Sequence, residues 1–268
     1  MKIISSKMNL NIKNLSKLNN SRKERSIQKL FIIEGLKIIK EAIINNIELQ
    51  DIFLTKKFLD EKEYELKHLL PNNAKMSIIN FELLNKISCT QTPQEIIAVC
   101  KIPNHINIDD LIFSSNNLLL ISQLQDPGNL GTIIRTSNAL GIDGIILSKD
   151  CPDIYSSKVL RSTMGCMFGF NIVVSEYISE IIEKCKNNKF KVYASSLSDT
   201  AIDITKVIFT KKNLIIVGNE GKGISQEIIN ICDIQIKIPM IKNMDSLNVS
   251  IATGILLWEL KKGVLKLK

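Results

Sequence analysis

Six short apolar runs recur through the second half of this 268-residue chain, with helical or loop segments between them. They are NLLLIS, GIILS, FNIVVS, KVYAS, NLIIVG and IQIKIP, between Asn117 and Pro239. Strands that alternate with helices are typical of βαβ units and of a mostly parallel sheet buried on both faces. Such a sheet binds ligands at the carboxyl ends of its strands, so we expect the chemistry in the loops that follow these runs.

The loop after the first run reads QDPGNLG, and Pro127 and Gly128 turn the chain out of the strand. We expect a helix to start near Leu130, where free backbone amides favour an anion or a polar ligand. Asn129 and Arg135 are six residues apart, which places them roughly 240° apart around a helix. They converge only if Asn129 lies in the turn before the helix; otherwise Arg135 lies at a helix edge.

The loop after NLIIVG reads GNEGKG and runs from Gly218 to Gly223. Glycines permit positive φ and a close approach of the backbone to a ligand. The order matches neither the dinucleotide fingerprint nor a P-loop, so a plain glycine-rich turn is the alternative. In the third loop a strand ends at Ile238-Pro239, and we expect Ser246 to cap a helix that runs toward Lys261.

The first half of the chain predicts a smaller α/β layer structure. Lys-rich helical stretches alternate there with LFIIEG, DIFLT, KMSIIN and EIIAVC. The segment from Lys101 to Asp110 has a proline, polar residues and no clean period, which is typical of a linker. We therefore assign residues 1–104 to an N-terminal domain, 105–116 to a linker and 117–268 to a second domain.

The charge balance favours a polyanionic partner. Lys and Arg number 35 against 27 Asp and Glu, a net charge of +8. Only four of the cations are arginines, namely Arg22, Arg25, Arg135 and Arg161, in a chain otherwise rich in lysine. These positions are therefore candidates for sites that need a planar, bidentate and permanently charged group.

Cysteine, histidine and the apolar runs exclude several classes of protein. The six cysteines form no C-x-x-C pair, which argues against a zinc site or a disulfide framework and favours reduced thiols in a cytoplasmic protein. We expect no metal and, with only two histidines, no histidine-based catalytic centre. No apolar run reaches transmembrane length, and we find no secretion signal, so no membrane partner is expected.

The three loops, in this order, resemble the SpoU or TrmH family of RNA 2′-O-ribose methyltransferases within the SPOUT class. The family's N-x-G-x-x-x-R after D-P is matched at Asn129, Gly131 and Arg135, and its G-x-E-G-x-G at residues 218–223. I-P-M followed by S-L-N-V-S is matched at residues 238–240 and 246–250. A K-x-x-R-x-S-x-G stretch is matched at residues 158–165, with Thr163 in place of the usual serine.

The N-terminal half carries a weaker match. SRKERSIQKL followed by FIIEG is similar to the ribosomal-protein-like RNA-binding domain often fused ahead of a SpoU domain. The resemblance thus implies a small α/β RNA-binding domain followed by an α/β catalytic domain, whose mostly parallel sheet forms a deep trefoil knot, an exception to the rule against knotted chains.

The resemblance implies transfer of a methyl group from S-adenosyl-L-methionine to a ribose 2′-hydroxyl in structured RNA, with 23S rRNA favoured over tRNA. It also implies a homodimer, with Ile251, Ile255, Leu256 and Trp258 of the last helix partly in the interface; an ordinary core helix is the alternative. The implied catalytic residues are Arg135, Asn129, Glu220, Ser246 and Asn248. The implied cofactor-binding residues are Gly218, Asn219, Gly223, Ile238, Met240 and Leu247. RNA contacts are expected from Arg161, Arg22, Lys23 and Arg25. A contact with the partner subunit is the alternative for Arg161, and a solvated charged face is the alternative for the three residues of the N-terminal half.

The sequence departs from the family at one position. Lys242 stands where the family usually has glycine after I-P-M, and we expect an altered loop geometry or substrate preference. Three alternatives stay open: a tRNA 2′-O-methyltransferase, a non-catalytic RNA-binding or ribosome-assembly factor of the same fold, and a nucleotide-dependent oxidoreductase. The last is disfavoured because no G-x-G-x-x-G follows the first strand of the second half.

Overall fold

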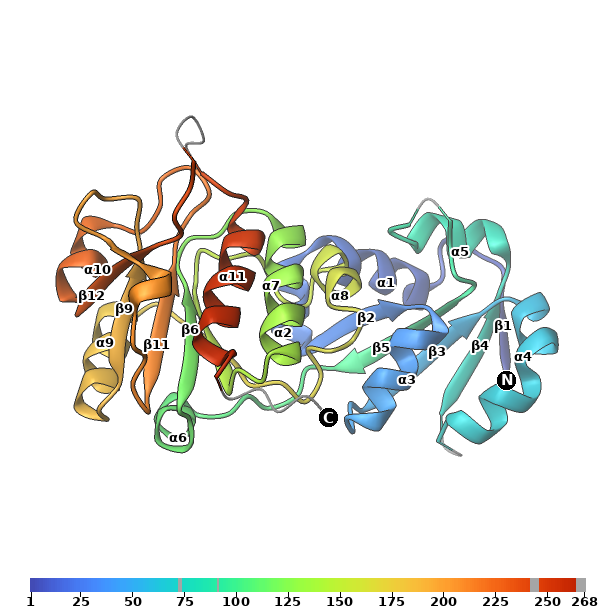
Figure 1. Cartoon of the computed structure of the whole chain (residues 1–268). Helices are drawn as coiled ribbons and strands as arrows, with labels where there is room; N and C mark the ends of the chain where they lie inside the picture. Colours follow the sequence, from blue (N-terminus) through green and yellow to red (C-terminus); the bar gives the residue numbers. More distant parts are fainter. Residues whose placement is uncertain (72–73, 91, 242–245, 264–268) are drawn as a thin grey trace. The chain divides into compact units, whose positions relative to one another are not determined.

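The computed structural model describes residues 1–71, 74–90, 92–241 and 246–263, which divide into two compact units (Figure 1). The N-terminal unit consists of residues 1–104 and 153–169, and the C-terminal unit consists of residues 105–152 and 170–268. The chain therefore passes from one unit to the other three times.

The C-terminal unit is built on a seven-stranded sheet in which every described pairing is parallel. In spatial order the strands are β10 (Ile202–Asp203), β12 (Ile234–Lys237), β9 (Lys191–Ser195), β11 (Asn213–Val217), β6 (Asn117–Ile121), β7 (Gly144–Ser148) and β8 (Ile172–Ser175). All residues of β7 and β11 are buried, as expected for strands covered on both faces. The predicted parallel α/β sheet is confirmed.

Helices cover both faces of this sheet. On one face, α6 (Ile108–Ser114), α9 (Ile178–Asn187) and α10 (Gln226–Ile231) bury apolar side chains against alternate residues of the strands. Helices α7 (Pro127–Ala139) and α11 (Val249–Lys261) pack side by side (Figure 1). A short 3-10 helix, η1 (Ile204–Lys206), follows β10.

The N-terminal unit contains a mixed five-stranded sheet. Its order is β1 (Lys2–Ile4), β4 (Lys75–Ile79), β3 (Leu49–Leu54), β5 (Ile96–Lys101) and β2 (Leu30–Glu34). On one face, α1 (Leu10–Asn20) and α5 (Phe81–Ile87) bury an apolar cluster that includes Leu15, Leu18 and Leu84. The remaining helices of residues 1–104 are α2 (Arg22–Gln28), α3 (Leu36–Ile44) and α4 (Lys56–Leu69).

The structure differs from the division expected from the sequence in two places. Residues 105–116 contain α6, whose Leu111 and Ile112 are buried in the core of the C-terminal unit, so a short helix occupies the expected linker. Residues 153–169, with α8 (Ser157–Thr163), belong to the N-terminal unit. There the ring of Phe31 lies 4.7 Å from that of Tyr155 and 6.0 Å from that of Phe168.

Each of the ten apolar runs contains a strand, as predicted. Among the described residues, two further strands were not predicted. These are β1, which has three residues and one buried side chain, and β10, which has two residues. Neither has the length or the alternation on which the sequence signal depends. Among the described residues, no helix has both the length and the apolar character needed to cross a membrane.

Candidate active site

The candidate site lies where the connections of the parallel sheet change direction. From β6 the chain continues outward through β7 and β8, whereas β11 and β9 lie on the opposite side of β6. Val217 at the end of β11 pairs with Ile121 at the end of β6, so the loops after these two strands leave the sheet side by side. Such a switch point is where open α/β sheets bind ligands.

The glycine-rich turn after β11 is held by its own backbone and by one asparagine. Asn219 and Gly223 exchange two backbone hydrogen bonds of 3.0 and 2.9 Å. The Oδ1 of Asn219 accepts from the backbone N–H groups of Gly221 and Lys222, at 2.9 and 3.0 Å. A Cβ on Gly218 would lie 2.3 Å from the carbonyl of Gly223, so this position requires glycine.

The loop after β6 is tied to this turn. The Nδ2 of Asn219 donates to the carbonyl of Gln123 at 2.8 Å, and the backbone N–H of Gln123 donates to Ser148 Oγ at 2.8 Å. Gln123 itself has a φ of 56°, a conformation that non-glycine residues seldom adopt. The hydrogen bonds on both sides of Gln123 stabilise this conformation and fix the spacing of the two loops.

Glu220 joins three elements of the site. Its carboxylate accepts hydrogen bonds from the backbone N–H groups of Gln125 and Asp126, both at 3.2 Å, and from Asn129 Nδ2 at 3.1 Å. Partial burial opposes ionisation, but hydrogen bonds from its own backbone, Asn129, Asp126 and Gln125 outweigh it and lower the pKa of Glu220. The site thus holds a carboxylate that stays ionised at neutral pH.

Asn129 connects this carboxylate to the third loop. Asn248 Nδ2 donates to Asn129 Oδ1 at 3.1 Å, and Asn248 Oδ1 accepts from the backbone N–H of Ser250 at 2.9 Å. Three of the five expected catalytic residues, Asn129, Glu220 and Asn248, therefore form one hydrogen-bonded chain. They come from α7, from the glycine-rich turn and from the start of α11.

The helix starts differ from those expected. Helix α7 begins at Pro127, three residues early, because Asp126 caps it by accepting from Asn129 N at 2.8 Å. The N-cap of α11 is Asn248, whereas the sequence predicted Ser246. Since Asn129 lies inside α7, Arg135 points away from it around the helix, and Arg135 is exposed and does not line the cavity described next.

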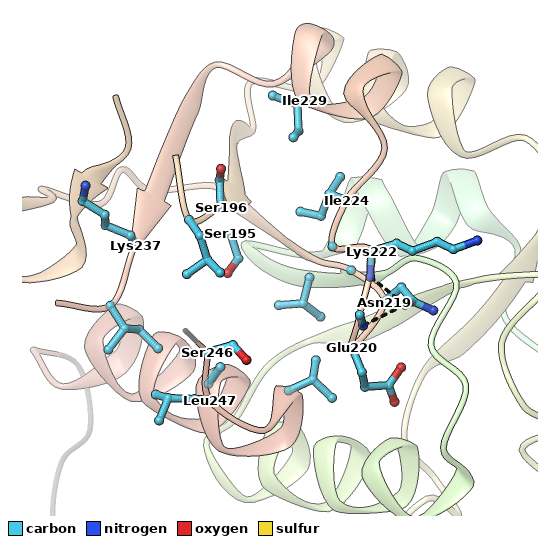
Figure 2. Close-up of a pocket in the computed structure, with 18 of the residues that line it drawn as sticks. Ser195, Ser196, Asn219, Glu220, Lys222, Ile224, Ile229, Lys237, Ser246 and Leu247 are labelled. Carbon is cyan, nitrogen blue, oxygen red and sulfur yellow. Dashed lines mark hydrogen bonds between the residues drawn. The ribbon is translucent and has the colours of Figure 1, made fainter. Parts of the chain in front are cut away.

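A cavity of about 480 Å³ opens beside the glycine-rich turn (Figure 2). Ser246 and Leu247 lie on one side of it, and Asn219, Glu220 and Lys222 lie on another (Figure 2). All six expected cofactor-binding residues line this cavity: Gly218, Asn219, Gly223, Ile238, Met240 and Leu247. Its volume lies within the range of small-molecule sites, about 300–1,000 Å³.

Sequence reasoning missed one wall of the cavity. Ser195 ends β9, the neighbour of β11, and Ser196 and Leu197 follow it; all three line the cavity with the expected residues. The rule that ligands bind at the carboxyl ends of parallel strands could have found them, because KVYAS was recognised as a strand. Ile224 and Ile229 add apolar surface (Figure 2).

The cavity suits an organic cofactor better than a metal. Its walls combine apolar side chains with serine hydroxyls, and the glycines let backbone amides and carbonyls approach a ligand closely. Among the residues that the structure describes, no cluster of His, Cys, Asp and Glu could hold a metal ion. Lys242, the expected departure from the family, lies outside the described residues.

The four residues expected to bind RNA differ in exposure. Arg25 is 5% exposed, and its guanidinium lies 2.7 Å from Asp153 and also donates to the carbonyls of Leu18 and Asn19. Because its donors are used inside the N-terminal unit, Arg25 is a structural residue and its assignment to RNA is corrected. Arg22 and Lys23 are exposed on α2, and Arg161 is exposed and donates to the carbonyl of Cys89 at 3.0 Å.

Comparison with protein families matches both halves of the chain. Residues 116–258 match the SpoU rRNA Methylase family, and residues 9–98 match the MRM3-like substrate binding domain. The fold and the site thus define a SpoU-type methylase domain preceded by a substrate-binding domain. This chain is a member of the SpoU rRNA Methylase family.

Relatives and solved structures agree with this membership. The chain is 31% identical over 261 residues to the 23S rRNA (guanosine(2553)-2′-O)-methyltransferase of Bacillus subtilis, covering 97% of this chain and 100% of that protein. An S-adenosylmethionine-bound rRNA methyltransferase from Sinorhizobium meliloti superposes with a TM-score of 0.86 at 25% identity, covering 99% of both chains. An RNA 2′-O ribose methyltransferase superposes with a TM-score of 0.82 at 27% identity, covering 98% of this chain and 100% of that chain.

Proposed function

We propose that this protein transfers a methyl group from S-adenosylmethionine to the 2′-hydroxyl of a ribose in 23S rRNA. The observation that carries the proposal is the hydrogen-bonded chain Asn248–Asn129–Glu220 beside a ligand-sized cavity at the switch point. The Bacillus subtilis relative, which aligns over its whole length, supports rRNA as the substrate. Because its proposed substrate is rRNA, we also propose that the protein acts in the cytoplasm.

The cofactor would bind in the cavity against the glycine-rich turn. Gly218 lets the turn close on itself, Gly223 leaves open space beside the turn, Ile238 and Leu247 would supply apolar contacts, and the backbone around them would supply hydrogen bonds. The bound S-adenosylmethionine supplies an electrophilic methyl group on its sulfonium. The expected trefoil knot, in which this cavity would lie, stays a prediction.

The residues around the cavity must orient the ribose and stabilise charge on its oxygen. The 2′-oxygen takes the methyl group and gives up its proton to water, so negative charge develops on an oxygen of low acidity. Arg135 is the residue that we assign to stabilise this charge, since an arginine is effectively never deprotonated and cannot serve as a base. Asn129, Ser246 and Asn248 would orient the ribose, and ionised Glu220 orients Asn129.

A second copy of the chain would bring Arg135 to the cavity. Arg135 lies on the exposed side of α7, and α11 packs beside that helix. Ile251, Ile255 and Trp258 of α11 are 57%, 36% and 50% exposed and recur at helical spacing, whereas Leu256 is buried within the unit. This apolar face favours a homodimer through α7 and α11, with Leu256 removed from the expected interface.

The N-terminal unit supplies the charge for RNA binding. It holds 19 Lys and Arg against 12 Asp and Glu, a net of +7, whereas the C-terminal unit holds 16 against 15, a net of +1. The first 29 residues alone hold eight basic residues and one acidic residue. Seven of the eight are exposed: Lys2, Lys7, Lys13, Lys17, Arg22, Lys23 and Lys29. We assign phosphate contacts to this segment.

The test is transfer of labelled methyl from S-adenosylmethionine to unmodified 23S rRNA and, separately, to unmodified tRNA. We expect label in 23S rRNA, a large loss with Arg135→Ala, and activity near wild type with Lys211→Ala, an exposed cation outside the site. Label in tRNA alone would establish the tRNA enzyme instead. Cofactor binding without label in either RNA, or in intact ribosomal particles, would favour the non-catalytic assembly factor.

A further inference from the structure

Lys222 lies at the rim of the cavity, on the glycine-rich turn. Its backbone N–H donates to Asn219 Oδ1 at 3.0 Å, and the residues on both sides of it are fixed by the Asn219–Gly223 backbone pair. The backbone at Lys222, from which its side chain starts, is therefore held by the same contacts that shape the turn beside the cavity. It stands one residue from Gly221 and two from Glu220.

No ion pair among the described residues neutralises the charge of Lys222. Lys222 is exposed, and no carboxylate among the described residues lies within ion-pair distance of its ammonium group. Glu220, the nearest acidic residue in sequence, uses its carboxylate on Asn129 and on the backbone of Gln125 and Asp126. Among the described residues, an unpaired cation thus stands on the same turn as Glu220, a member of the candidate catalytic chain.

The side chain of Lys222 leaves the turn away from the cavity. In Figure 2 its ammonium group lies on the far side of the turn from Ser195 and Ser196. This direction argues against a contact with the cofactor, which would occupy the cavity, and favours a ligand outside its mouth. The C-terminal unit carries a net charge of only +1, so local cations rather than an overall field must hold a polyanion there.

We propose that Lys222 binds a backbone phosphate of the RNA next to the target ribose, and so positions its 2′-hydroxyl. The inference rests on the proposed function and deepens it by naming a substrate contact. In RNA every 2′-hydroxyl is flanked by the phosphate on the adjacent 3′-oxygen, so a cation beside the catalytic chain meets that phosphate when the ribose is in place. Lys222 is a positioning residue, because it touches neither the methyl group nor the reacting oxygen.

The experiment uses full-length Lys222→Ala, Lys222→Arg and Lys222→Glu, with Lys211→Ala as the matched control. Lys211 is also exposed and lies before β11, at the opposite end of that strand. The KM for RNA and the affinity for S-adenosylmethionine are measured between 50 and 300 mM salt. We expect Lys222→Ala to raise the KM for RNA about 3- to 10-fold and to reduce the salt slope by about 0.7–0.9.

The other variants and the cofactor titration distinguish a phosphate contact of Lys222 from a contact with the cofactor. Lys222→Arg should keep most of the RNA affinity, Lys222→Glu should lose more than Lys222→Ala, and the cofactor affinity should stay unchanged in all three. An unchanged KM and salt slope would overturn the proposal, and so would a loss of cofactor affinity as large as the loss for RNA. If the wild type transfers no methyl group, the proposed function fails, and the salt slope of RNA binding alone still decides the role of Lys222.

Discussion

Among single residues, Glu220 connects the most parts of the candidate site, and its ionisation can be tested. Its pKa is lowered in the folded state, so its carboxylate stabilises the fold above the pKa of an unfolded glutamate, about 4.3, and this contribution disappears as the pH falls toward the lower folded value. We expect Glu220→Gln to cost about 1 kcal/mol at pH 7, a modest value because the group is largely exposed.

Urea unfolding at pH 7, 5, 4 and 3.5 measures this contribution. The difference between wild type and Glu220→Gln should be constant at the two higher values and should shrink below about pH 4.3. Glu227→Gln, an exposed carboxylate in the first turn of α10, serves as the control. A difference that grows as the pH falls would contradict the lowered pKa of Glu220.

The four arginines show what residue type alone can and cannot reveal. Their scarcity marked them as sites that need a permanent planar cation, and Arg25 does need one, since it donates to Asp153 and to two backbone carbonyls. The sequence could not distinguish this internal use from an RNA contact, because Asp153 lies 128 residues away along the chain. Whether a side chain is buried depends on the whole fold, so the composition of a helix does not predict it.

At the scale of elements, the glycine-rich turn gives a matched pair of substitutions. Gly218→Ala would place a methyl group 2.3 Å from the backbone of Gly223, whereas in Gly221→Ala the nearest atom, Asn219 Oδ1, lies at 3.8 Å. We expect Gly218→Ala to move the turn, to lower cofactor affinity at least tenfold and to destabilise the protein by about 1–3 kcal/mol. Gly221→Ala should bind the cofactor within about twofold of wild type.

Calorimetric titration with S-adenosylmethionine and thermal unfolding of both variants provide the measurement. Equal cofactor affinities in the two alanine variants would show that the contact between Gly218 and Gly223 does not shape the cavity. A loss in both would instead indicate that the whole turn tolerates no side chain.

The elements also show why the prediction of the site was uneven. Apolar runs of five or six residues fixed the central strands, and the rule of carboxyl ends then located the loops that line the cavity. The start of α7 was misplaced because Pro127 and Gly128 were interpreted as a turn, whereas Asp126 caps the helix and Pro127 begins it. The contact between Asn248 and Asn129 joins residues 119 positions apart in the sequence, and no local sequence pattern predicts a contact over such a separation.

For the whole molecule, mixing two inactive variants tests whether each active site needs two chains. Arg135→Ala and Glu220→Ala each remove one part of the proposed site. If Arg135 acts across the dimer, every mixed dimer contains one intact site, and random exchange of subunits should restore about a quarter of the wild-type activity. The measurement is methyl transfer after the two proteins are unfolded and refolded together.

The control is each variant refolded alone, which should stay inactive. If Arg135 acts within its own chain, no mixed dimer contains an intact site, and the mixture should be as inactive as its components. Trp258→Glu, on the exposed face of α11, should shift the protein toward a monomer in analytical ultracentrifugation and reduce activity together with the dimer.

Because residues 153–169 belong to the N-terminal unit, the chain cannot be divided into its two units by a single cut. Without that segment, residues 1–104 would expose the fully buried ring of Phe31 and would leave Arg25 without its carboxylate. The substrate-binding half is thus completed by sequence encoded within the methylase half. A fragment of residues 1–104 alone would therefore lack part of its own core, and the N-terminal unit should be produced together with residues 153–169.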